Sequence, residues 1–234
     1  MSRRRAVNAP PELARLAATM RAPRAAAVAG IVFSVVFGLA LALLQSAVPV
    51  DPADVGDWIF SDSQRTRAEL ALSLLPFAGI AFLWFIGVVR DQLGDREDRF
   101  FATVFLGSGL LFVALMFVGG AAMSALIGLG EDGELDPDVW RFGRRFVFAA
   151  MNVYALRTAA VFTITASTLS GRLGAMPRWL QIAGYLTAVA LLFGPTFAPW
   201  VVMVFPIWVL AVSIQILRAG GDARPEHDGQ SGNT

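Results

Sequence analysis

Residues 179–217 read WLQIAGYLTAVALLFGPTFAPWVVMVFPIWVLAVSIQIL, a run of 39 residues without a charge. As one helix this run would be about 58 Å long, roughly twice the hydrocarbon thickness of a bilayer. The chain must therefore turn back within it. Pro195 and Pro199 lie near its middle, and proline interrupts helical hydrogen bonding, so a tight hairpin is predicted there. The hairpin separates a span at 179–194 from a span at 200–217.

The rest of the chain repeats this pattern of long apolar stretches. Hydrophobic residues make up 56% of the 234 positions and charged residues only 16%, which is more apolar than a soluble protein of this length. Further stretches long enough to cross a bilayer lie at 25–48, 70–89, 100–129 and 146–169. We therefore expect an all-α bundle of six transmembrane helices. Because 179–194 is short, five spans with a re-entrant segment are the alternative.

Three regions are predicted along the chain. Residues 1–24 form a basic segment in which Pro10 and Pro11 open a short helix lying on the inner leaflet, with an unstructured basic tail as the alternative. Residues 25–217 form the helical bundle. Residues 218–234 are rich in Gly, Asp and Ser and are predicted to be a disordered cytoplasmic tail.

The arginines predict the orientation in the membrane. All 19 basic residues are arginine, and placing the N-terminus inside assigns 13 of them to inner segments and five to outer loops. Cytoplasmic segments are enriched in positive residues, so both termini are predicted to be cytoplasmic in a multi-pass plasma-membrane protein. Arg141, Arg144 and Arg145 before the fourth span are an exception. The pattern favours pairing of this trio with the acidic residues of the outer loops.

Arg157 is the most informative single residue. It lies 12 positions after Arg145 and 12 before Leu169, about 18 Å from either end of its predicted span. A charge at the bilayer centre costs roughly 2.5–3.5 kcal/mol on the lower of the published scales, and the side chain is too short to reach a headgroup. We therefore expect Arg157 to face the interior of the bundle.

The span around this arginine is the most polar of the six. Asn152, Tyr154 and Thr158 are the neighbours that we select with Arg157 as a candidate site for a small anion or a lipid headgroup. The structural alternative is an arginine bonded to backbone carbonyls or to polar residues of adjacent helices.

Composition argues against most catalytic chemistry. The chain has no cysteine, and its one histidine, His227, lies in the polar tail. No metal site, cofactor or disulfide is therefore predicted, and with no paired intramembrane carboxylates an enzyme is disfavoured. The net charge of +1 gives no reason to expect a nucleic-acid partner.

Four segments of the chain form a recognisable set: GDREDRFFAT at 94–103, NVYALR at 152–157, MPRWL at 176–180 and VFPIWVL at 204–210. Together they resemble a group of uncharacterised actinobacterial multi-pass membrane proteins. The likeness covers about residues 70–217 and implies a helical membrane domain in which the Arg157 and Arg178 neighbourhoods are typical of the group. It carries no activity.

These observations leave two functional hypotheses besides an enzyme. The favoured one is a non-catalytic membrane protein that interacts with membrane lipids or with a protein, either a second copy of itself or a partner membrane protein. The alternative is a transporter, channel or anion binder that uses Arg157. The absence of an internal sequence repeat weighs against a transporter.

Overall fold

The computed structural model describes residues 11–48, 61–93, 99–133, 135–172, 174, 176–194 and 198–221, and these form helices without a strand among them. The predicted all-α class is confirmed. The elements in chain order are α1 (Pro11–Ala47), α2 (Asp62–Leu93), α3 (Arg99–Glu131), α4 (Pro137–Phe148), the π-helix η3 (Ala149–Ala155), α5 (Leu156–Arg172), α6 (Arg178–Phe193), the 3-10 helix η5 (Pro199–Met203) and α7 (Val204–Gly221).

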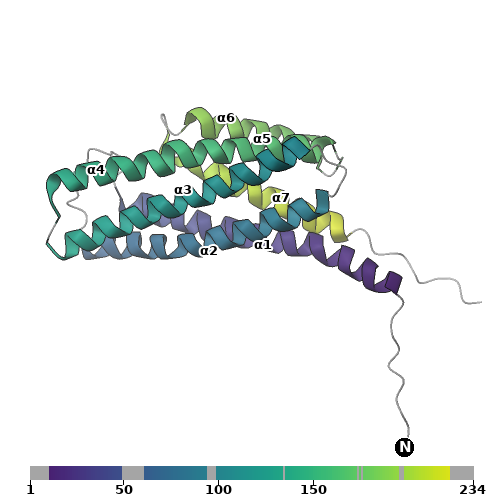
Figure 1. The fold of residues 1–234 in the computed structure, drawn as a ribbon, viewed down its shortest axis with the longest axis horizontal. Coiled ribbons are helices and arrows are strands. Elements are labelled where there is room, and N and C mark those ends of the chain that lie inside the picture. Colours follow the sequence, from purple (N-terminus) through teal and green to yellow (C-terminus); the bar gives the residue numbers. More distant parts are fainter. Residues whose placement is uncertain are drawn as a thin grey trace, which may run out of the picture.

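Five helices are long and apolar enough to cross a membrane. One of them combines α4, η3 and α5 into a single rod of 36 residues, Pro137–Arg172. The shorter helix α6 has 16 residues, about 24 Å, and lies beside α5. Helix α6 carries the chain back toward the start of α7. As a result, the start of α1 and the end of α7 lie at the same end of the bundle (Figure 1).

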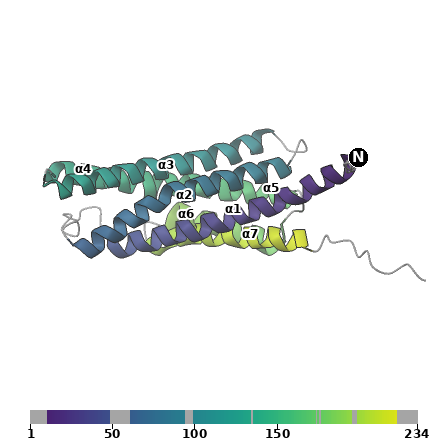
Figure 2. The ribbon, with the colours of Figure 1, turned by 90° about the horizontal axis from the view of Figure 1, so that it is seen from below.

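The helices pack in a closed ring. Each of α1, α2, α3, α5, α6 and α7 lies beside the next, and α7 lies beside α1 (Figure 2). Glycine allows two of these approaches: a Cβ on Gly109 of α3 would overlap Ile86 of α2, and one on Gly30 of α1 would overlap Ser213 of α7. Small residues at such contacts bring helix backbones close together, as membrane helices require.

Phenylalanine rings fill the centre of this ring of helices. We name the central phenylalanine cluster as one buried residue from each of five helices: Phe33, Phe82, Phe112, Phe162 and Phe205. Ring centroids lie 4.6 Å apart for Phe33 and Phe82, 5.1 Å for Phe82 and Phe162, and 5.0 Å for Phe112 and Phe205. Tilted and edge-to-face pairs of this kind contribute about 0.5–1.5 kcal/mol each beyond their buried area.

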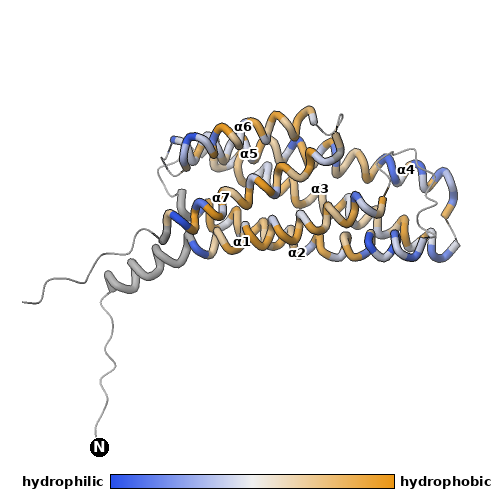
Figure 3. The backbone as a smooth tube through the Cα atoms, turned by 180° about the vertical axis from the view of Figure 1, so that it is seen from behind, coloured by the Kyte–Doolittle hydropathy of each residue, from blue (hydrophilic) through white to orange (hydrophobic). Residues whose placement is uncertain are grey.

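The outer surface of the bundle is apolar as well. Large side chains point away from the protein, among them Phe77, Trp84, Leu186 and Ile207, each more than 60% exposed. Hydrophobic residues occupy the middle of the bundle, and hydrophilic ones gather toward its ends (Figure 3). Exposed apolar surface of this extent is unsuited to water, so the chain is a multi-pass membrane protein.

The chain reverses where the proline pair predicted it. Helix α6 ends at Phe193, and a 3-10 turn begins at Pro199 and leads into α7. Both predicted helices of the hairpin are therefore present, although only the second is long enough to cross a membrane, and residues 195–197 at the tip lie outside the described residues. The choice between six spans and five with a re-entrant segment stays open.

The N-terminal helix begins close to the proline pair that predicted it. It starts at Pro11 and runs without a break to Ala47, and the position of its first part on the inner leaflet stays a prediction. Residues 1–10 and most of the predicted C-terminal tail, 222–234, lie outside the described residues, and α7 extends four residues past the predicted boundary at Leu217, to Gly221.

The central cluster predicts a large difference between two phenylalanines of α2. We expect Phe82→Ala to lower the free energy of unfolding by about 3–5 kcal/mol, because it opens a cavity at a fully buried site. Phe77→Ala is the matched control, since Phe77 is 66% exposed on the same helix. Unfolding of both variants in the same detergent measures the difference. Equal losses would show that the cluster is not the core of the fold.

Candidate functional site

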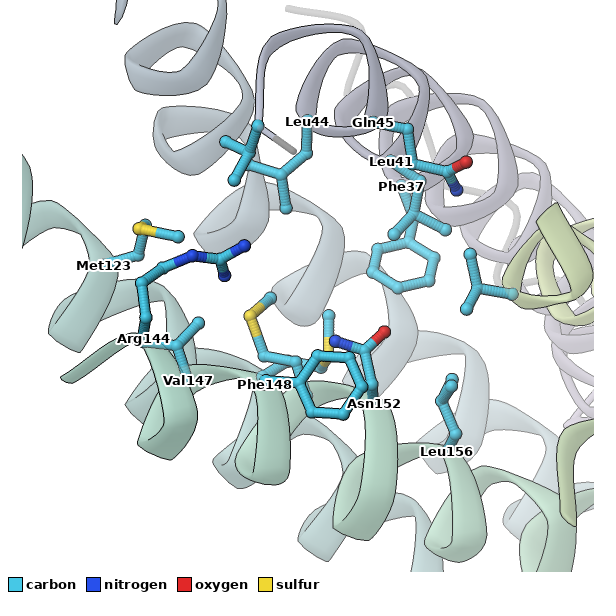
Figure 4. A pocket seen from close by; sticks show the side chains of 14 residues that line it. Phe37, Leu41, Leu44, Gln45, Met123, Arg144, Val147, Phe148, Asn152 and Leu156 are labelled. Carbon is cyan, nitrogen blue, oxygen red and sulfur yellow. The ribbon is translucent and has the colours of Figure 1, made fainter. Parts of the chain in front are cut away.

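A half-open pocket lies toward the end of the bundle at which α1 ends and α2 begins. Its volume is about 110 Å³, and its walls come from α1, α3, η5 and the α4–η3 part of the long rod. Facing sides are provided by the last turns of α1 and by α4 and η3 (Figure 4). Segments far apart in the chain therefore meet at this one place.

Three polar side chains line the pocket. Arg144 of α4 is only 5% exposed. Asn152 of η3 and Gln45 of α1 complete the polar set, and Figure 4 shows that Arg144 and Asn152 project from one side and Gln45 from the other. The amide nitrogen of Gln45 is buried and has no hydrogen-bond partner among the described residues. The pocket thus holds one permanent cation and two neutral amides.

The remaining wall of the pocket is apolar. Phe37 and Leu41 contribute from α1, Met116 from α3, and Met151 and Leu156 from the rod. Methionine side chains are flexible and adapt to ligands of irregular shape. A polar group and an apolar chain can therefore be held side by side in this cavity.

Local sequence explains why Arg144 points inward. Helix α4 begins at Pro137 after Asp136, whose Oδ1 accepts hydrogen bonds from the backbone N–H of Asp138 at 2.7 Å and of Val139 at 3.4 Å. From that start the residues at 140, 144 and 147 share one face. Trp140, Arg144 and Val147 are indeed its buried residues.

The π-helix η3 brings Asn152 to the same side as Arg144. In a regular α-helix two residues eight positions apart point about 80° away from each other. The wider i→i+5 turns of Ala149–Ala155 change this rotation, and both side chains reach the pocket. Such π-turns within α-helices occur frequently at functional sites.

The prediction that Arg157 faces the interior is wrong. Arg157 is exposed on the outer surface of the rod, and its Nη1 donates a hydrogen bond to the backbone oxygen of Val153 at 3.1 Å. It nevertheless lies within the apolar part of the bundle, between Met151, which packs on Gly119 of α3, and Phe162, which packs on Gly109.

The four predicted site residues do not form one site. Asn152 lines the pocket, whereas Tyr154 is 60% exposed on the outer surface. Thr158 is half-buried, and its hydroxyl donates to the backbone oxygen of Ala155 at 2.8 Å. Asn152 and Arg157 are five positions apart, so even in a regular α-helix their side chains point about 140° away from each other.

The sequence interpretation missed Arg144. That interpretation placed it among loop arginines paired with outer acids, and among the described residues Arg141 of this trio does pair with Asp138. The signal that identifies Arg144 is the cap at Asp136 followed by Trp140 and Val147 on its own face. Arg144, one of the three arginines that depart from the enrichment of positive residues on the cytoplasmic side, is therefore a buried residue of the pocket.

A second polar contact lies at the same end of the bundle. Arg65 of α2 pairs with Glu131 of α3 through an Nε–Oε1 distance of 3.0 Å and also contacts Asp62 and Glu69 of its own helix. These side chains are partly exposed, so the contact contributes little to stability. It joins α2 to α3 at the polar end of the bundle.

Comparison with protein-family models, curated proteins and solved structures finds no match to this chain. The resemblance to an actinobacterial membrane family therefore stays a prediction.

The exposed position of Arg157 predicts an unusual effect of mutation. We expect Arg157→Leu to raise the stability of the isolated protein in phosphatidylcholine vesicles, by up to about 3 kcal/mol, because it removes a charge from an apolar surface. Arg145→Leu is the control, because Arg145 is exposed at the polar end and should change stability by no more than about 0.5 kcal/mol. Thermal unfolding measures both. A clear loss of stability in Arg157→Leu would mean that the guanidinium has an internal structural role.

Proposed function

We propose that this chain is a non-catalytic membrane protein that binds an anionic amphiphile, with the acidic headgroup at Arg144 and the acyl chain along the apolar wall. One observation carries the proposal: a guanidinium that is 5% exposed lines a half-open cavity whose other walls are mostly apolar. A guanidinium in the wall of such a cavity can donate charge-assisted hydrogen bonds to an anionic group bound there.

The donors in the pocket fit an oxyanion. Guanidinium binds phosphate or carboxylate through two parallel hydrogen bonds, which are roughly twice as strong as bonds between neutral groups. The Gln45 amide nitrogen, which has no partner among the described residues, adds a further donor from the opposite side. Asn152 supplies another amide. Together these groups favour an anion over a neutral or cationic headgroup.

The size of the pocket favours part of a lipid over a whole one. A closed cavity of about 150 Å³ holds benzene. The 110 Å³ found here therefore takes a headgroup oxyanion or the first carbons of a chain, and the open side leaves the rest of the chain free to extend. Each buried methylene contributes about 0.8 kcal/mol, so chain length should strengthen binding until the wall ends.

The depth of the polar groups in the membrane matches that of a lipid headgroup. Gly143, next to Arg144, packs on Leu126 of α3, five residues before Glu131, which pairs with Arg65 of α2. On α2 the uncharged stretch 70–89 starts just beyond that level and has 20 residues, about 30 Å, which equals one hydrocarbon core. The guanidinium therefore lies near the boundary between headgroups and acyl chains.

A channel or transporter and an enzyme are the two alternatives, and both have less support. The central phenylalanine cluster fills the middle of the helix ring, which argues against a continuous aqueous path through it. The three polar residues of the pocket are an arginine and two amides, which are poor nucleophiles and bases, so catalysis is disfavoured. Binding without chemistry is the function that the residues support best.

The orientation is part of the same proposal. With 13 inner and five outer arginines, both termini are cytoplasmic, and the pocket opens at the outer leaflet of the plasma membrane. A reporter enzyme fused after Leu217 should stay in the cytoplasm, whereas one inserted in the first loop near Asp57 should be exported. Export of the C-terminal reporter would reverse the orientation.

The pocket predicts a selective loss of binding. Purified parent protein should bind tetradecyl phosphate more tightly than tetradecanol, and Arg144→Gln should reduce phosphate binding at least tenfold, since charge-assisted hydrogen bonds contribute about 1.5–3 kcal/mol. Arg145→Gln is the matched control, because this neighbouring arginine is exposed and points away from the pocket. Isothermal titration calorimetry in a neutral detergent gives both affinities. Equal binding by the two variants, or by the phosphate and the alcohol, would refute the role of Arg144.

A further inference from the structure

We propose that the outer face of the rod around Arg157 is a docking surface for the transmembrane helix of a different protein, and that this helix carries a carboxylate at the depth of Arg157. The face consists of Tyr154, Arg157, Val161 and Ile164, which lie three or four positions apart on one side of the rod. All four are exposed. We call them the Arg157 face; the proposal is independent of the pocket.

The charge of Arg157 requires a partner within the membrane. Its guanidinium has five N–H donors, and the described residues provide one acceptor, the backbone oxygen of Val153 in the same rod. Val161 and Ile164 continue the face with apolar surface, 40% and 37% exposed. Lipid chains hold no acceptor, and ionisable residues at this depth pair with one another. A carboxylate on a neighbouring helix accepts hydrogen bonds from the guanidinium and neutralises its charge.

The bundle leaves space for such a helix beside the rod. The short helix α6 packs along α5 and ends at Phe193, before the level of α4 (Figure 1). Outside its own rod, η3 packs mainly on α3, which lies on another side. The flank that carries Tyr154 and the guanidinium therefore has no long helix of this chain covering it among the described elements.

A second copy of this chain does not fit as the partner. The carboxylates whose side chains the structure describes lie at the polar end of the bundle: Asp62, Glu69, Glu131, Asp132, Asp136 and Asp138. The apolar stretches at 100–129, 146–169 and 179–217 contain neither Asp nor Glu. No carboxylate of a second copy would thus reach the depth of Arg157. Charge complementarity points to another protein.

A model helix tests this pairing directly. The probe is a leucine-rich transmembrane peptide with one central glutamate, compared with the same peptide carrying glutamine. Because the chain lacks cysteine, Asp132→Cys gives a single site for a dye at an exposed position away from the Arg157 face. Energy transfer in phosphatidylcholine vesicles should show about tenfold tighter association with the glutamate peptide, consistent with one strong intramembrane contact.

Further variants are made in the dye-labelled Asp132→Cys protein. Arg157→Leu should remove the preference for glutamate, Arg157→Lys should keep most of it, and Arg145→Leu should leave it unchanged. The proposal is overturned if the parent binds both peptides equally, or if Arg157→Leu retains the preference. It is also overturned if differently labelled copies of the parent associate with each other and Arg157→Leu abolishes this, because the face would then be a homotypic interface.

Discussion

The central phenylalanine cluster is the contact on which the rest of this structure depends. A membrane helix bundle gains no hydrophobic driving force from association, because lipid chains are as apolar as leucine, so close packing must hold the helices together. Five rings from α1, α2, α3, α5 and α7 meet within 6.2 Å of a neighbour and bring these helices to a common centre. Helix α6 contributes no ring to the cluster and instead packs on α5 and α7, where Trp208 Nε1 donates to the backbone oxygen of Leu180. With the centre filled by aromatic rings, the charged side chains that the structure describes lie toward the ends or on the outer surface of the bundle.

Three arginines show how one side-chain type serves different purposes in this environment. Arg65 is partly exposed and pairs with acidic residues at the polar end of the bundle. Arg144 is buried beside a cavity with two amides, where an anionic headgroup suits its charge. Arg157 is exposed within the apolar zone, where only a group from outside the described chain can neutralise it. Because all three residues are arginines, their different roles follow from how deeply each is buried in the protein and how deep it lies in the membrane.

Much of the fold follows from the sequence, and the pocket follows only in part. The spans are recognised by their length without charge, and the hairpin after Phe193 by its prolines. The sequence grouped Asn152 with Arg157, whereas the structure places Asn152 in the pocket and Arg157 on the outer surface. The cap at Asp136 sets the phase of α4 and would have identified Arg144. The contribution of Gln45 from α1 could not be foreseen, because it depends on how the first and fourth spans approach each other.

The sequence by itself determined that this protein is a bundle of membrane-spanning helices and where its apolar spans lie, because a stretch without charges can be read directly from the chain. It did not give the starts of the helices, since α1, α2 and the rod begin at Pro11, Asp62 and Pro137, well before the predicted spans. Only the tertiary structure decided which side of each helix faces its neighbours. The π-turn at Ala149–Ala155 rotates the second half of the rod against the first. Asn152 thereby joins Arg144 at the pocket, whereas Arg157 of the same continuous helix lies outside.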